Sequence, residues 1–242
     1  MIVLFTDFGW EGPYIGQMQA SIHAIAPQAA VVNLFADVPA HNPRASAYLL
    51  AAYAPAFPAG SVFVCVVDPG VGTAQHQPGV VRCDGRDYVG PDNGQFEMIR
   101  RRGKKVENYH ILWRPERLSH SFHGRDLYAP VAAMLAPGQP VDLKATAGLR
   151  FPDWPDDLAE IIYLDHFGNA MTGLQASTMP AGAALRVKGR SLPRLKTFAE
   201  AGLGEGFWYE NANGLVEIAV NQGRADHVYD LSVGDAVKVE AS

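Results

Sequence analysis

An apolar stretch that ends abruptly in a carboxylate and two glycines constrains this chain most. Residues 62–67 are mainly β-branched, lie between turn-forming residues, and are typical of a central strand in a parallel sheet. Asp68 follows at the carboxyl end of this strand, where open α/β sheets bind their ligands. Pro69 ends the strand, and Gly70 and Gly72 permit a tight turn. An aspartate in such a turn can also cap local amides, so a ligand-binding role and a purely structural role both stay open here.

Strands alternate with helices through the first part of the chain. The sequence predicts a strand over residues 1–6, a helix over 13–26, a strand over 31–35 and a helix over 45–53. Asp7 ends the first strand as Asp68 ends the later one. This alternation predicts a mostly parallel sheet covered by helices on both faces, because right-handed crossovers need that arrangement.

Turn-forming residues dominate the region from 79 to 94. Asp84 and Gly85 separate two extended runs, which predicts a two-residue hairpin turn. The turn-rich segment 90–94 comes directly before a predicted helix over 95–102. On local chemistry alone, a loop that caps the helix is the favoured interpretation, and a functional role stays open.

A second cluster of ionisable residues precedes an apolar helical run. Residues 119–130 include His123, Arg125 and Asp126. We expect a helix to begin here, and the amides and dipole at a helix start favour anions. A single histidine is often a satisfied core residue, but several ionisable groups at a helix start indicate a site.

The pattern of apolar and polar residues changes near residue 150. Residues 151–157 form a linker-like stretch, after which helical periodicity gives way to short β runs that suit a small barrel or sandwich. These runs cover 161–165, 184–187, 207–210, 215–220 and 235–240, with a predicted hairpin turn over 211–214. We therefore predict two domains, an α/β domain over 1–150 and a β domain over 151–242.

Charge and cysteine content exclude several classes of protein. With 20 basic and 25 acidic residues the net charge is −5, and the sequence lacks the basic face of a nucleic-acid binder. We interpret the basic cluster at 100–105 as a solvated helix end. Cys65 and Cys83 fit no metal-ligand or disulfide spacing, so we expect two buried thiols. The first residues do not resemble a signal peptide and no apolar run suits a membrane span, so we expect a cytoplasmic protein without membrane partners.

Five motifs in order resemble one protein family. Asp7 and segments 68–73, 90–94, 122–126 and 167–169 are similar to those of the S-adenosyl-L-methionine hydroxide adenosyltransferases, which are hydrolases related to the fluorinase and chlorinase. The resemblance implies a Rossmann-like amino-terminal domain, a carboxy-terminal β-barrel and a homotrimer with each active site between neighbouring subunits. It also implies attack of water or hydroxide on ribose C5′ of S-adenosyl-L-methionine, which releases adenosine and L-methionine. No metal or cofactor is implied.

The same resemblance suggests roles for individual residues. Asp68 and His123 match the catalytic aspartate and histidine of the family, and Asp7 matches its ribose-binding carboxylate. The remaining substrate-binding positions, which would contact the adenine and amino-acid ends, are Asn93, Asp165, Phe167, Asn169 and Ala212.

The chain departs from the family at three places. The family has a catalytic arginine shortly after the glycine loop, which is segment 68–73 in this chain. Gln75 stands at the position of that arginine if no gap is introduced. His41 and Asn42 replace an aromatic residue followed by Asp, and Ala212 replaces the serine of the halogenases. The aromatic run 207–209 is either a stacking wall for the substrate or a plain core strand.

Three functions fit these residues. The first is the hydrolase. The second, suggested by the missing arginine, is a protein that binds S-adenosyl-L-methionine or adenosine without turnover. The third replaces water by halide, but Asp68 argues against it because a carboxylate beside the nucleophile repels an anion.

Overall fold

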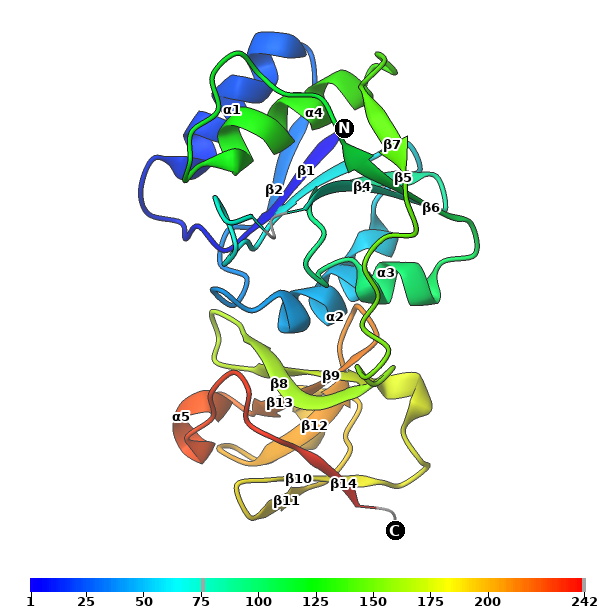
Figure 1. Ribbon diagram of the computed structural model, residues 1–242. Coiled ribbons are helices and arrows are strands. Elements are labelled where there is room, and N and C mark those ends of the chain that lie inside the picture. The colour runs from blue at the N-terminus through cyan, green and yellow to red at the C-terminus, as the bar shows by residue number, and fades with distance from the viewer. Residues whose placement is uncertain (75–76, 241–242) are drawn as a thin grey trace. The chain divides into compact units, whose positions relative to one another are not determined.

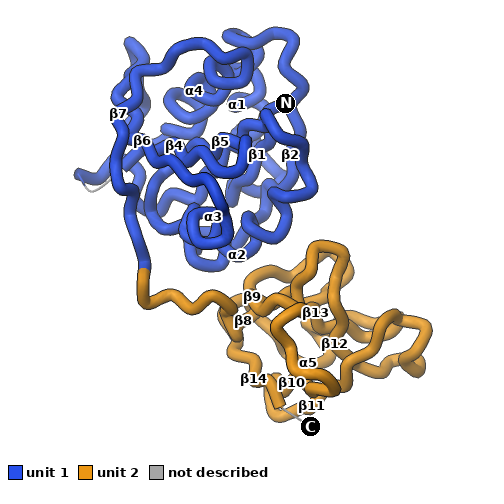
Figure 2. Tube along the Cα trace, turned by 90° about the vertical axis from the view of Figure 1, so that its right-hand side faces the viewer, with its two compact units in different colours: residues 1–151 blue, residues 152–242 orange. Residues whose placement is uncertain are grey.

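The computed structural model describes residues 1–74 and 77–240, and the chain divides into two compact units, 1–151 and 152–242. Figure 2 colours them blue and orange. Each unit contains a hydrophobic core of its own.

The first unit is built on a seven-stranded sheet with the order β2-β1-β3-β5-β4-β6-β7. Its strands are β1 Ile2–Thr6, β2 Val31–Phe35, β3 Val62–Val66, β4 Pro78–Cys83, β5 Arg86–Pro91, β6 Val106–Ile111 and β7 Leu143–Ala145. The adjacent strands β2, β1, β3 and β5 run parallel to one another. Strand β4 pairs antiparallel with β5 and β6, and β6 pairs antiparallel with β7. The predicted mostly parallel sheet is therefore confirmed, and its antiparallel edge follows from the β4–β5 hairpin.

Helices cover both faces of this sheet, with α1 and α4 on one side and α2 and α3 on the other (Figure 1). They are α1 Tyr14–Ile25, α2 Pro43–Tyr53, α3 Glu97–Arg102 and α4 Ala129–Leu135. On the α1 side, Met18 and Ile22 are fully buried against Leu4 and Val64. Burying such side chains stabilises the fold by roughly 1.5 to 3 kcal/mol each.

Most local predictions in the first unit are confirmed; the exceptions are the start of α3, the exposure of the basic cluster and two strands that were not predicted. The hairpin turn is confirmed, since Asp84 and Gly85 both have positive φ, 49° and 80°, between β4 and β5. Helix α3 begins two residues later than expected. The interpretation of residues 100–105 as a solvated helix end was wrong for Arg100, which is buried and ion-paired with Asp92. Strands β6 and β7 were not predicted, because neither shows clear alternation.

The second unit is antiparallel. One sheet has the order β12-β13-β9-β8 and the other β11-β10-β14. Its elements are β8 Leu158–Leu164, β9 Ala170–Gln175, β10 Ala184–Val187, β11 Arg190–Leu192, β12 Gly206–Glu210, β13 Leu215–Val220, α5 Ala225–Tyr229 and β14 Lys238–Glu240. Both sheets contribute to one core around Trp208. Asn211 and Gly214 close the predicted hairpin through a main-chain hydrogen bond of 3.0 Å.

Two further expectations concern the chemistry of the chain. Cys65 and Cys83 are free and buried, as predicted. Within the described part of the chain, none of the helices combines the length and apolar character that crossing a bilayer requires.

Candidate functional site

Two carboxylates lie at the carboxyl ends of neighbouring parallel strands. Strands β1 and β3 pair in register up to Thr6 and Val66. Asp7 follows β1 directly, and its backbone N–H donates to the Val66 carbonyl at 3.3 Å. Asp68 comes two residues after Val66, at the start of the glycine loop. The pairing of the two strands therefore delivers both carboxylates to one edge of the sheet, where ligands of open α/β sheets bind.

The glycine loop is held against the segment that carries His123. Gly72 has φ +77°, and a Cβ added there would lie 2.6 Å from the His120 carbonyl oxygen. Within the loop, the Thr73 hydroxyl donates to the Gly70 carbonyl at 2.8 Å. Only glycine fits position 72, because a side chain would meet both a disfavoured backbone angle and a neighbouring main chain.

His123 stands at the start of a single π-helical turn, Gly124–Tyr128, which runs into α4. The predicted helix start is thus confirmed, although its first turn is wider than an α-helical one. Arg125 and Asp126 form an ion pair within this turn, with 2.5 Å between Nε and Oδ1. The Asp126 carboxylate also accepts the Ser119 N–H at 2.9 Å, which fixes the loop before His123.

Asp7, Asp68 and His123 line one pocket of about 280 Å³ in the first unit. Three aromatic rings, Phe8, Tyr14 and Phe122, are packed edge to face or tilted, with ring centroids 5.4 to 5.7 Å apart. All three line the pocket as well. The sequence analysis did not assign this aromatic wall, because Phe8 and Tyr14 lie at the two ends of the β1–α1 connection while Phe122 belongs to the distant segment before Gly124–Tyr128.

Burial governs the electrostatics of Asp7. It raises the pKa of this carboxyl above its ordinary value, and the negative charge of Asp68 adds to the increase. The backbone N–H of His41 opposes the effect by donating to Asp7 Oδ2 at 3.0 Å. His41 thus takes part in the site through its main chain, with φ at +57°, a role that the sequence did not indicate.

No arginine takes the missing position among the described lining residues of this pocket. Arg125 is paired with Asp126, and its guanidinium lies 5.1 Å from the centre of the Phe122 ring. Tyr128 is close enough to Asp68 for that charge to add to burial in raising the pKa of the phenol well above its usual value. Gln75 and His76 lie outside the described residues, so the assignment of Gln75 to catalysis stays a prediction.

The second unit contains a pocket of about 630 Å³ that brings together Asp165, Phe167 and Asn169. Asp165 accepts hydrogen bonds from the N–H and Nδ2 of Asn169, at 2.8 and 2.9 Å. Phe167, at the tip of this turn, is 71% exposed. The predicted motif 167–169 therefore forms a turn that leaves an aromatic ring on the pocket surface.

Glu217, which the sequence analysis did not single out, also lines this second pocket. It accepts the Tyr209 hydroxyl at 2.5 Å and Asn211 Nδ2 at 2.8 Å. Burial raises the pKa of Glu217 above its ordinary value. The available signal was a single carboxylate inside the apolar run 215–220. Phe207 and Trp208 are fully buried core residues, so in the aromatic run only Tyr209 reaches the pocket.

Two predicted substrate-binding residues lie outside both pockets as described. Asn93 donates from Nδ2 to the Val67 carbonyl at 2.8 Å, and Ala212 is exposed in the hairpin turn after β12. Residues 1–74 and 77–240 contain no group of three or more His, Cys, Asp or Glu side chains placed to hold a metal ion.

Comparisons with known proteins cover nearly the whole chain. Residues 2–144 match the SAM hydroxide adenosyltransferase N-terminal domain, and residues 159–238 match the C-terminal domain. A protein named (R)-S-adenosyl-L-methionine hydrolase from Thermus thermophilus is 36% identical, with 98% of each chain covered. A fluorinase from Actinopolyspora mzabensis is 24% identical, covering 100% of this chain and 97% of its own. The crystal structure of an uncharacterized conserved protein from Thermotoga maritima superimposes with a TM-score of 0.88 at 28% identity, with both chains fully covered.

Proposed function

This chain belongs to the SAM hydroxide adenosyltransferase family, and from that premise we propose that it hydrolyses S-adenosyl-L-methionine to adenosine and L-methionine. The observation that carries the proposal is the pocket in which Asp7, Asp68 and His123 come together. Its acidic character suits a substrate that carries a positive sulfonium.

The proposed reaction asks little of the protein beyond positioning. The water oxygen forms a bond to ribose C5′ while the C5′–S bond breaks, and its electron pair leaves with sulfur as a neutral thioether. The attacking water loses a proton, which Asp68 can accept, and His123 can fix a second direction of the water. Because the sulfonium is already a good leaving group, no acid is needed behind it, and orientation supplies most of the acceleration.

The other residues are proposed to hold the substrate. Asp7 binds the 2′ and 3′ hydroxyls, for which two carboxylate oxygens are suited. The aromatic wall of Phe8, Tyr14 and Phe122 excludes water from the reacting carbon. Residues Asp165, Phe167 and Asn169 bind the adenine and amino-acid ends. Gln75, where relatives carry the arginine, donates hydrogen bonds without a charge.

The finer expectations belong to the same proposal. We propose a homotrimer, on the strength of family membership, which light scattering of the purified protein would test. A reducing, cytoplasmic location is supported by two buried free thiols. We propose that no cofactor takes part, because the sulfonium itself supplies the leaving group.

Hydrolysis is tested by turnover in water enriched with heavy oxygen. The label is expected in the 5′-hydroxyl of adenosine and not in methionine, as read by mass spectrometry after chromatography. Because the name of the Thermus relative carries the prefix (R), both sulfonium epimers should be supplied separately. Tight binding of either epimer without products would favour the non-catalytic binding protein. A 5′-halo-adenosine formed in chloride would favour a halogenase instead.

A further inference from the structure

A side-chain amide holds the main chain immediately before Asp68. Asn93 lies in the turn after β5, the strand beside β3, and its Nδ2 donates to the Val67 carbonyl at 2.8 Å. The peptide unit that begins with this carbonyl is planar and ends at the Cα of Asp68. Fixing the oxygen therefore fixes the plane from which the Asp68 side chain departs.

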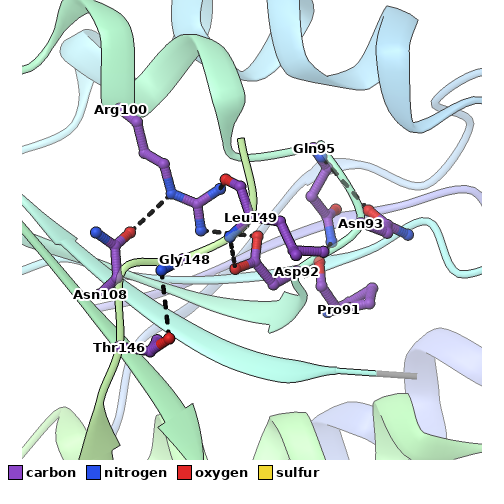
Figure 3. A network of polar contacts seen from close by, with 9 residues as sticks. All are labelled: Pro91, Asp92, Asn93, Gln95, Arg100, Asn108, Thr146, Gly148 and Leu149. Carbon is purple, nitrogen blue, oxygen red and sulfur yellow. Dashed lines mark hydrogen bonds and ion pairs between the residues drawn. The ribbon is translucent and has the colours of Figure 1, made fainter. Parts of the chain in front are cut away.

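The turn that carries Asn93 is itself fixed on several sides. Asp92 is buried and accepts hydrogen bonds from Arg100 Nη2 at 2.7 Å and from the Leu149 N–H at 3.0 Å (Figure 3). Its backbone N–H donates to the Gln77 carbonyl at 2.7 Å, just after the glycine loop. Arg100 is held in turn by Asn108, whose Oδ1 accepts its Nε at 2.7 Å. The exposed fraction of the Arg100 side chain is 1%, so solvent does not loosen the pair.

Strands β3 and β5 approach each other closely just before this hydrogen bond, which limits the positions that the Asn93 amide can take. A Cβ added to Gly90 would lie 2.0 Å from the Cys65 carbonyl oxygen. Gln95 completes the turn: its N–H donates to Asn93 Oδ1 at 3.4 Å and its Nε2 to the Pro91 carbonyl at 2.7 Å (Figure 3). The nitrogen and the oxygen of the Asn93 amide are thus both hydrogen-bonded to main-chain groups. This places Asn93 as a support for the loop that begins at Asp68.

We infer that Asn93 is a positioning residue that sets the orientation of Asp68 through the Val67 carbonyl, an inference that rests on the proposed hydrolysis. It replaces the assignment of Asn93 as a substrate contact. Asn93 acts on Asp68, the carboxylate that orients the attacking water, so its loss affects the chemical step more than adenosine binding, which depends on Asp7.

The chain offers a matched control for this role. In the second unit, Asn221 Nδ2 donates to the Ala201 carbonyl, also at 2.8 Å and also partly buried. Asn93→Ala and Asn221→Ala therefore remove the same kind of hydrogen bond, and their midpoints of thermal unfolding should fall by similar amounts. Only Asn93→Ala should lower kcat, by about 10- to 100-fold, because a small displacement of a catalytic group is costly. Its dissociation constant for adenosine should stay near that of the wild type.

A second measurement does not depend on turnover. The carboxyl carbon of Asp68, followed by carbon-13 NMR against pH, should titrate with a different midpoint in Asn93→Ala and an unchanged one in Asn221→Ala. If the wild type does not hydrolyse S-adenosyl-L-methionine, the proposed function fails, and this titration alone decides the role of Asn93. If Asn93→Ala does not fold, Asn93→Ser carries the same comparison, since its hydroxyl is one bond too short to reach the carbonyl.

Two results would overturn the inference. One is an Asn93→Ala protein whose kcat and Asp68 titration match those of Asn221→Ala. The other is a loss of kcat accompanied by an equal loss of adenosine affinity, which would indicate general damage to the first unit.

Discussion

The two pockets of this chain hold their carboxylates in different ways. In the first unit, Asp7 and Asp68 are placed by the ends of two paired strands, and the main chain does most of the work. In the second unit, both oxygens of Asp165 and both oxygens of Glu217 accept hydrogen bonds from protein groups. The difference is that strand pairing places the carboxylates of the first pocket, whereas hydrogen bonds to both oxygens of each carboxylate orient those of the second.

The sharpest way to break this comparison is Asp7→Ala. If Asp7 binds both ribose hydroxyls, the variant loses two hydrogen bonds to a charged group, worth roughly 1.5 to 3 kcal/mol each. Adenosine affinity should then fall by about 10² to 10⁴-fold in calorimetry, with little change in thermal stability. Unchanged affinity would show that Asp7, like Glu217 in the second pocket, serves the fold.

The pH dependence of adenosine binding provides the control for Asp7. Burial raises the pKa of Asp7, so the carboxylate gains its proton at a higher pH than an exposed aspartate, whose ordinary value is 3.8. Adenosine affinity of the wild type should weaken as pH falls through this raised pKa. The same acid limb should be missing from Asp7→Ala.

Asp68→Asn should have the next largest effect. An amide of nearly the same shape orients water less well and cannot take its proton, so kcat should fall by about 10² to 10³-fold. The midpoint of thermal unfolding should hardly move, because Asp68 stands in a half-buried loop. Turnover at the wild-type rate would remove Asp68 from the mechanism.

Glu217→Gln should have the smallest effect and a different kind of effect. The new amide presents its NH₂ group either to Asn211, where two donors then face each other, or to Tyr209, whose hydroxyl must turn and accept instead, so either arrangement weakens the present hydrogen bonds. The free energy of unfolding should fall by about 1 to 3 kcal/mol, measured with urea. A variant as stable as the wild type would erase the contrast between the pockets.

The sign of the pH effect at Glu217 follows from its raised pKa. The folded protein holds this proton more tightly than the unfolded chain does, so the contribution to stability is greatest below the ordinary value of 4.5. It is lost as pH rises from 4.5 through the raised folded pKa. The stability difference between the wild type and Glu217→Gln should therefore narrow over that interval and then stay constant.

Much of the first unit could be predicted because its signals are local. The run before Asp68, the predicted helix over 13–26 and the turn at Asp84 each depend on neighbouring residues in the sequence. What the sequence missed depends on partners far along the chain. Arg100 appears in a basic cluster, yet Asp92, Asn108 and the Leu149 carbonyl hold it inside the protein.

The second pocket was harder to predict for the same reason. Glu217 lies opposite Tyr209 across the β12–β13 pair, and only that register shows that the carboxylate has a donor for each oxygen. Asn93 matched a family motif, but its partner, the Val67 carbonyl, lies 26 residues earlier, just after β3. Motif matching found the residue, whereas only the fold showed what it contacts.

Because Gly72 lies so close to the His120 carbonyl, two loops that are distant in the sequence must change together. The glycine loop of this chain could not be transferred by itself into a related enzyme, because the backbone of each loop limits the shape that the other can take. Loop grafting, directed recombination and library design should therefore exchange residues 68–74 and 118–124 together. Crossovers placed between them would produce mismatched halves even where every side chain is compatible.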